Sequence, residues 1–330
     1  LFLRPGDDGV AETVAEGYPD GVDPADQADL HLADVDGDGA LDRVFATTFA
    51  PTRETLVIDV VPAEGEPWHQ EIPYAATPWG AADAVQVLFG DLDRDGRADL
   101  VVANEYLTDG FSVFVGSAGD GAFADPEEWY AASTEASLAQ LDVADFDGDG
   151  EHDVLASLEG PADDSADAPW SIELQLLTSD GSALSAAGAP RPLGPGNYPQ
   201  GVRLYGDLDG DGSDEPLLVG PGGFATTSFS AGAAPDVVPV WEVDPANQAW
   251  QARYERYSSV ASADWVMSDV DGDGDDDLVF LQFRGDEDSR PVTVRLAEEG
   301  QLGDPAPWGS FDCGTACGPV FDYRPVTPAY

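Results

Sequence analysis

Carboxylate side chains recur in a nine-residue pattern whose spacing brings several oxygens toward one point. The pattern Asp-x-Asp-x-Asp-Gly-x-x-Asp/Glu occupies 34–42, 91–99, 145–153, 207–215 and 269–277, here numbered loops 1 to 5. Four such charges in one tight loop repel one another, and Coulomb's law at an intermediate dielectric gives a cost on the order of several kcal/mol. A hard divalent cation relieves this repulsion. Calcium accepts about six to eight oxygen ligands in flexible geometry, whereas magnesium demands stricter geometry and fits less well.

Each loop offers side-chain ligands at positions 1, 3, 5 and 9 and a main-chain carbonyl at position 7. The glycine at position 6 permits the sharp turn. One calcium ion per loop gives about five ions in all. The predicted ligands are Asp34, Asp36, Asp38, Ala40 and Asp42; Asp91, Asp93, Asp95, Arg97 and Asp99; Asp145, Asp147, Asp149, Glu151 and Asp153; Asp207, Asp209, Asp211, Ser213 and Glu215; and Asp269, Asp271, Asp273, Asp275 and Asp277.

An EF-hand loop and a metal-free acidic turn are the two other interpretations of this pattern. An EF-hand loop needs glutamate at position 12 and a helix on each side, but position 12 here is Phe45, Val102, Ala156, Leu218 and Phe280. The second alternative is a set of acidic turns without metal, because Asp-Gly is a common turn pair. Five copies that keep every ligand position favour the metal.

The segments around the loops repeat as well and have the length of strands. First aspartates are 57, 54, 62 and 62 residues apart, and a small residue precedes each loop (Ala33, Gly90, Ala144, Gly206 and Ser268). Apolar or alternating runs flank the loops, so each loop is expected to join two strands. Third strands are predicted at 111–115, 172–177, 237–241 and 292–296, and fourth strands near 128–130 and 251–254. Four strands per repeat predict an all-β propeller with four-stranded antiparallel blades.

The two ends of the chain are expected to close the ring together. Residues 1–3 and 13–14 resemble the last two strands of a blade whose first half is missing. We expect 1–20 and 309–330 to complete this closing blade within one domain spanning 1–330, giving six blades, with five or seven as alternatives. Cys313 and Cys317 predict a disulfide that fastens the closing blade in an oxidising compartment, whereas a zinc site would lack further ligands.

The composition excludes several classes of partner. The chain has 65 acidic residues against 13 basic ones, all arginine, for a formal charge of -52, and 42% of its residues are hydrophobic. Nucleic acids and anionic membranes would be repelled, and no apolar run approaches the ~20 residues of a membrane span. A high-salt habitat or a GC-rich genome would also produce this acidity. The first residue is Leu1, as in a processed secreted protein or a trimmed fragment.

The loop between two strands resembles the FG-GAP/VCBS repeat, the calcium-binding blade unit of integrin-α-like propellers. The Phe89-Gly90 pair is similar to that family's signature, and the repeats cover nearly the whole chain. Arg94 at position 4 of loop 2 and Glu215 at position 9 of loop 4 depart from the family pattern, and both leave ligation plausible. The resemblance implies a propeller stabilised by calcium.

These features predict a secreted or surface-displayed module that binds a protein or glycan partner. Cytosolic calcium is too dilute for sites with dissociation constants of ~10⁻⁴ to 10⁻³ M. Irregular connections such as 159–165, 221–227 and 284–286 suit recognition. A subunit of a filament or surface layer is one alternative. A polysaccharide lyase is another, but His31, His69 and His152 form no evident catalytic spacing, so catalysis is not expected.

Overall fold

A computed structural model gives the fold of most of the 330-residue chain. No helix among the described residues is long and apolar enough to cross a membrane. The described residues are 2–5, 11–15, 29–47, 55–73, 84–106, 110–133, 137–161, 170–192, 203–220, 223–229, 238–242, 265–281 and 289–312.

Within these ranges, the structure contains five antiparallel sheets with the four-stranded order of a propeller blade. Small hairpins accompany two of them, β10 (Ala118–Gly119) with β11 (Ala122–Phe123) and β25 (Ala297–Glu298) with β26 (Gln301–Leu302). In the third blade β17 (Arg191–Pro192) also pairs with β15. The blades are β3 (Asp29–Ala33), β4 (Asp42–Thr47), β5 (Thr55–Val61) and β6 (Trp68–Pro73); β7 (Ala84–Gly90), β8 (Asp99–Tyr106), β9 (Gly110–Gly116) and β12 (Glu127–Ala132); β13 (Ser137–Ala144), β14 (Asp153–Pro161), β15 (Trp170–Ser179) and β16 (Leu184–Ala186); β18 (Arg203–Gly206), β19 (Glu215–Gly220), β20 (Gly223–Thr226) and β21 (Val238–Glu242); and β22 (Trp265–Ser268), β23 (Asp277–Leu281), β24 (Ser289–Arg295) and β27 (Ala306–Asp312).

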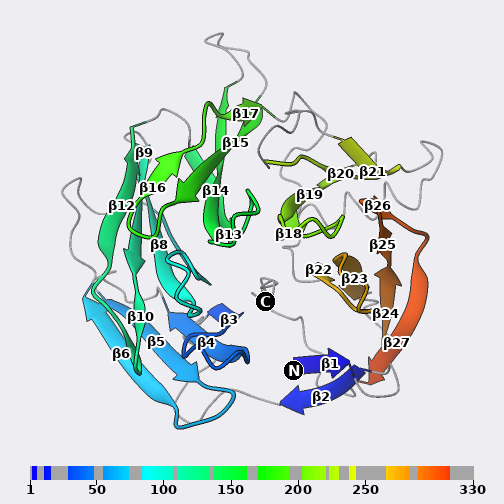
Figure 1. The fold of residues 1–330 in the computed structure, drawn as a ribbon, viewed down its shortest axis with the longest axis horizontal. Helices are drawn as coiled ribbons and strands as arrows, with labels where there is room; N and C mark the ends of the chain where they lie inside the picture. Colours follow the sequence, from blue (N-terminus) through cyan, green and yellow to red (C-terminus); the bar gives the residue numbers. More distant parts are fainter. Residues whose placement is uncertain are drawn as a thin grey trace.

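The blades follow one another around a ring in sequence order (Figure 1). Strands β3, β13, β18 and β22 lie toward the centre, and β6, β12 and β27 lie at the rim. The hairpin of β1 (Phe2–Pro5) and β2 (Ala11–Ala15) lies between the fifth blade and the first. The predicted propeller is therefore confirmed, with five four-stranded blades among the described residues rather than the favoured six.

The expected closing blade lies partly outside the described ranges. The hairpin of β1 and β2 supplies the two N-terminal strands that the sequence predicted. Residues 309–312, however, belong to β27, the fourth strand of the fifth blade, because they pair with β24. Residues 313–330, including both cysteines, lie outside the described ranges, so the disulfide and the sixth blade stay predictions.

The fourth blade corrects one strand assignment. The segment predicted as its third strand, 237–241, forms the fourth strand β21 instead. The third strand is β20, within the stretch 221–227 that the sequence predicted to be an irregular connection. Backbone pairing of β20 with β19 overrides the turn-forming glycines around it, and Phe224 and Ala225 become buried there. Residues 251–254 lie outside the described ranges.

The hydrophobic core lies between neighbouring blades. Alternate residues of β5 are buried, as expected for a strand with one covered face. One apolar cluster joins Ile58 of the first blade to Leu100 of the second. The next joins Val113 of the second blade to Leu141 of the third. Each fully buried side chain of this size contributes about 1.5–3 kcal/mol, so the ring is stabilised mainly through its blade-to-blade contacts.

Candidate metal centres

All five loops connect the first strand of a blade to the second, as predicted. Each loop wraps around the carboxylate at position 1. In loop 1, Asp34 Oδ1 accepts hydrogen bonds from the N–H groups of Gly37 (2.7 Å) and Asp38 (3.2 Å), and Oδ2 accepts one from Gly39 (2.8 Å). The N–H groups of positions 5 and 6 donate to position 1 in all the other loops too. The backbone N–H groups alone thus fix the orientation of the position-1 carboxylate.

The carboxylate at position 9 ties its loop to the rest of the blade. In loop 1, Asp42 Oδ2 accepts the N–H of Val35 at 3.1 Å, and Oδ1 accepts that of Ala63, beyond the third strand, at 2.7 Å. Asp99 and Asp277 receive the same pair of hydrogen bonds. A single side chain therefore holds the start of the loop, the second strand and the end of the third strand together.

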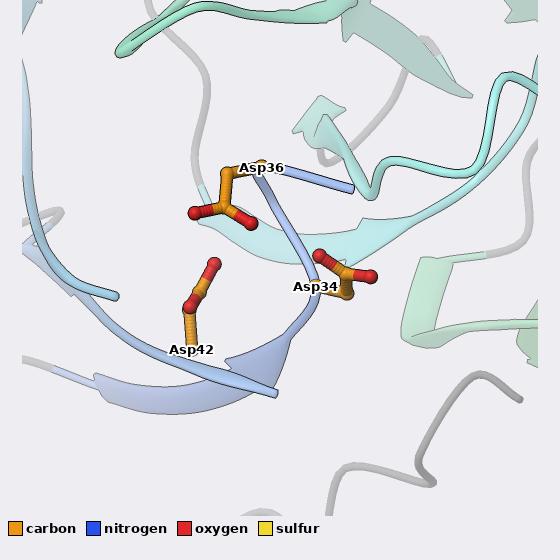
Figure 2. A group of neighbouring side chains, drawn as sticks. All are labelled: Asp34, Asp36 and Asp42. Carbon is orange, nitrogen blue, oxygen red and sulfur yellow. The ribbon is translucent and has the colours of Figure 1, made fainter. Parts of the chain in front are cut away.

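The loops bring some of the predicted ligands together and leave others apart. Figure 2 shows the carboxylates of Asp34, Asp36 and Asp42 pointing toward one another. In loops 1 to 4, one oxygen each from positions 1, 3 and 9 lies within 4.8 Å of the others; in loop 5 the group comprises positions 1, 3 and 5. The groups in loops 1 to 4 do not include position 5, whose carboxylate accepts the N–H of position 7 in every loop. Ligation through the carbonyl of position 7 stays a prediction.

Burial changes the acidity of the position-9 carboxyl groups. Asp42, Asp99 and Asp277 are fully buried and Asp153 and Glu215 nearly so. Loss of solvent raises the pKa of Asp99 to about 7, of Asp153 and Glu215 to about 8, and of Asp277 to about 6, and neighbouring aspartates of the same loop add to each increase. At neutral pH, Asp153 and Glu215 are therefore favoured either as the neutral acid or next to a cation.

The surroundings of one carboxylate oxygen in loop 3 bear on whether these residues fit a metal ion. Asp153 Oδ2 is buried and has no hydrogen-bond partner among the described residues, whereas its Oδ1 accepts the N–H of Ser179 at 3.0 Å. Asp145 and Asp147 offer an oxygen each within 4.8 Å in the same group. A buried carboxylate oxygen without a donor, beside two further carboxylates, suits a hard cation with oxygen ligands. The residues present therefore fit calcium.

Consecutive loops are also hydrogen-bonded to one another, which the sequence did not predict. The N–H at position 8 donates to the carbonyl of position 1 in the preceding loop: Ala98 to Asp34 (2.7 Å), His152 to Asp91 (2.8 Å), Asp214 to Asp145 (2.6 Å) and Asp276 to Asp207 (2.5 Å).

The small residue before each loop is the sequence signal that accompanies this contact. A Cβ on Gly90 would lie 2.7 Å from His152 Nδ1, and one on Gly206 would lie 2.5 Å from Asp276 Oδ2. The side chain at position 8 thus occupies the space in front of the preceding loop. This explains why even the methyl group of alanine would be too large at Gly90 and Gly206.

The remaining predicted residues are placed as follows. His31 is buried in β3 with its ring 5.0 Å from that of Phe89. His69 lies in strand β6, and its Nδ1 is 2.8 Å from Asp59 Oδ1. That hydrogen bond raises the pKa of His69, whereas burial lowers the pKa of His152 in loop 3. Residues 284–286, Cys313 and Cys317 lie outside the described ranges.

The comparison with protein families agrees with this architecture. Residues 91–156, which span loops 2 and 3, match the family model of the FG-GAP-like repeat. No curated protein matches the chain. Among solved structures, a lectin from Agrocybe aegerita, described as recognising non-reducing terminal N-acetylglucosamine, is 15% identical, with 85% of this chain and 80% of that chain covered at a TM-score of 0.44. We draw no conclusion about ligands from that likeness. The repeat match at residues 91–156 and the ring of blades together support an FG-GAP-like repeat β-propeller.

Proposed function

We propose that the protein is a calcium-stabilised β-propeller, secreted or displayed on a cell surface, that binds a protein or glycan partner. The observation that carries the calcium part is the carboxylate group in loop 3, where Asp153 Oδ2 is buried without a donor among the described residues and Asp153 is grouped with two further aspartates. The equivalent groups in the other loops extend this argument around the ring.

Calcium in these loops has a structural role. When bound, it supplies the positive charge that keeps the position-9 carboxyl groups ionised in spite of their burial. Those same groups hold the backbone of the second and third strands, as Asp42 does with Ala63 and Asp277 does with Ala297. Loss of the ion therefore weakens the attachment of each loop to its own blade.

Partner binding follows from the scaffold. Connections between second and third strands leave the blades at the end opposite the calcium loops, and rigid frames with variable connections are suited to recognition. Several of these connections, such as 48–54 and 162–169, lie outside the described ranges. The extracellular setting rests on the millimolar calcium available there, which matches sites with dissociation constants of ~10⁻⁴ to 10⁻³ M.

The first test is thermal unfolding of the full chain in calcium, in magnesium and after removal of divalent ions. A ligand that binds only the folded state stabilises it by about 1.4–2.7 kcal/mol per site at ~10 mM calcium for these affinities. Five sites should therefore raise Tm by on the order of 10 °C, and magnesium should do less. An unchanged Tm would overturn the calcium assignment.

Two variants make the assignment specific to the loops. Asp153→Asn should remove part of the calcium-induced rise in Tm, because it removes a charged oxygen of the loop 3 group. Asp125→Asn, at an exposed aspartate outside the loops, should keep the full rise. Partner binding is then tested by screening calcium-loaded and ion-depleted protein against glycans and surface extracts, with binding expected only for the loaded form.

A further inference from the structure

We propose that the calcium loops bind their ions as one coupled row, in which each filled loop prepares the next. This inference rests on the proposed calcium binding and adds a relation between the sites. Its basis is that position 8 of each of loops 2 to 5 is hydrogen-bonded to the residue that supplies the first predicted ligand of the preceding loop.

The backbone contact places two ligand-bearing segments in direct register. Asp214 N donates to the carbonyl of Asp145, and the next residue, Glu215, supplies the position-9 carboxylate of loop 4. Asp145 itself supplies the position-1 carboxylate of loop 3. An ion in either loop therefore restrains a peptide group that belongs to the neighbouring site.

Side chains reinforce this contact in the second half of the row. Asp214 Oδ2 accepts the N–H of Asp145 at 3.2 Å, and Asp276 Oδ2 accepts the N–H of Asp207 at 3.2 Å. Together with the backbone hydrogen bonds, each pair is joined by two hydrogen bonds in opposite directions. Neither Asp214 nor Asp276 is a predicted ligand, so both are positioning residues.

A second connection runs through the last residue of the third strand, Ser179. Ser179 N donates to Asp153 Oδ1, the position-9 carboxylate of loop 3, at 3.0 Å. The hydroxyl of the same serine donates to the carbonyl of Leu92, inside loop 2, at 2.6 Å. One residue thus links a ligand of loop 3 to the backbone of loop 2. In the fifth blade, Gly300 N similarly donates to the carbonyl of Leu208 in loop 4.

Ordering provides the physical basis of the coupling. An ion that orders one loop reduces the conformational entropy that the adjacent loop must lose when it binds its own ion. Filling a neighbour also removes negative charge, which opposes this gain, but at ~0.15 M salt the Debye length is about 8 Å and screening weakens the opposition. Positive cooperativity should therefore exceed electrostatic competition.

The test is native mass spectrometry of the full chain in ~0.15 M ammonium acetate, the ionic strength at which screening is effective, with increasing calcium. Coupling predicts that ion-free and nearly full protein coexist while forms with one or two ions are depleted relative to a binomial distribution. Independent sites predict the binomial distribution. A protein that binds no calcium would refute the proposed function itself, whereas binomial filling would refute only the coupling.

Two variants sharpen the result. Asp147→Ala disables loop 3, and coupling predicts that the remaining ions bind about fivefold or more weakly, the lower range of typical coupling energies. Unchanged affinity at the other loops would overturn the proposal. Asp214→Ala, at a position where loop 2 has Ala98, should populate intermediate forms, and Asp214→Asn, which keeps an acceptor oxygen, should restore the depletion. Equal distributions for both variants and the unmodified chain would also contradict it.

Discussion

The contacts between loops differ in charge between the two halves of the row. Loop 2 contributes arginine on both of its sides: Arg97 Cγ lies 3.0 Å from where a Cβ on Gly37 of loop 1 would be, and Arg94 Nη2 lies 2.9 Å from the equivalent point on Gly150 of loop 3. Between loops 3, 4 and 5, Asp214 and Asp276 instead bring further carboxylates into the contacts. The backbone hydrogen bond is the same in both halves.

The two halves therefore share the backbone geometry of their contacts but differ in the charge of the side chains beside them. Loops 1 to 3 meet with cations between them, so part of their repulsion is balanced without a metal ion. Burial, together with the charge of Asp276, raises the pKa of Asp214 to about 7, and burial raises the pKa of Asp276 to about 6. We infer that the second half depends more strongly on calcium than the first.

The largest expected effect is unequal loosening when calcium is removed. Calcium removal at one fixed pH near 8 should increase amide exchange rates more in the second half than in the first. The increase in β18, β19, β22 and β23 should exceed that in β3, β4, β7 and β8 by about tenfold or more, which corresponds to a difference of about 1.4 kcal/mol in the free energy of local opening. Hydrogen exchange with mass spectrometry of loaded and depleted protein measures this. Equal loosening of both halves would contradict the comparison.

The next effect is on the pH dependence of Tm, which calcium should cancel or reverse in sign. A carboxyl group whose pKa is higher in the folded than in the unfolded state stabilises the fold below its unfolded pKa, about 4, and that contribution is lost as pH rises through the folded pKa. Asp153 and Glu215 reach about 8, and Asp99 and Asp214 about 7. Depleted protein should therefore show a falling Tm between about pH 5 and 8.

Melting curves across that pH range, with and without calcium, check the prediction. The stabilisation by calcium should grow with pH, because calcium competes with fewer protons. Asp214→Asn should flatten the depleted profile, and the exposed Asp125→Asn should not change it. A Tm that rises with pH in depleted protein would mean that these carboxyl groups are not held in a low-dielectric environment.

Local repetition explains what the sequence predicted well. The propeller, the loops between first and second strands and most strand positions follow from patterns within each repeat, such as 111–115, which lies in β9. Strand β20 was missed because Gly223 and its neighbours carry turn signals, and only pairing with β19 makes the segment a strand. Asp38 stays a predicted ligand: its carboxylate accepts the N–H of Ala40, and the group of neighbouring carboxylates in loop 1 comprises Asp34, Asp36 and Asp42.

The contacts between loops were beyond prediction for a different reason. Gly90 and Gly206 were recognised as part of a small-residue pattern, but the side chains that require them belong to the next blade. Nothing in a single repeat tells which residue will face it across a blade boundary. Asp214 and Asp276 therefore looked like variable residues inside the pattern, and only the arrangement of the ring gives them a role.

A smaller effect tests the space in front of loop 2. Gly90→Ala would place a methyl group 2.3 Å from Val143 Cγ1 and 2.7 Å from His152 Nδ1, so we expect a loss of about 1–3 kcal/mol in unfolding free energy. Adding His152→Ala reproduces the pairing of Ala33 with Ala98 in the first contact and should recover part of the loss. Denaturant unfolding in calcium measures both. If Gly90→Ala were as stable as the unmodified chain, the steric explanation of the small residue would be wrong.

The smallest effect concerns position 7, where Arg97 of loop 2 and Asp275 of loop 5 carry opposite charges. Arg97 Nη1 lies 3.1 Å from Oδ1 of Asp120, an aspartate 97% exposed, so this ion pair is worth about 0–1 kcal/mol and Arg97→Gln should barely change Tm in calcium. In depleted protein the loss of a cation beside loops 1 and 2 should lower Tm. Asp275→Asn removes an anion beside loops 4 and 5 and should raise Tm under the same conditions. Only electrostatics predicts Tm shifts in opposite directions for two substitutions at the same position of the repeat. Tm shifts of the same sign for both variants would therefore show that charge balance between the loops does not distinguish the two halves.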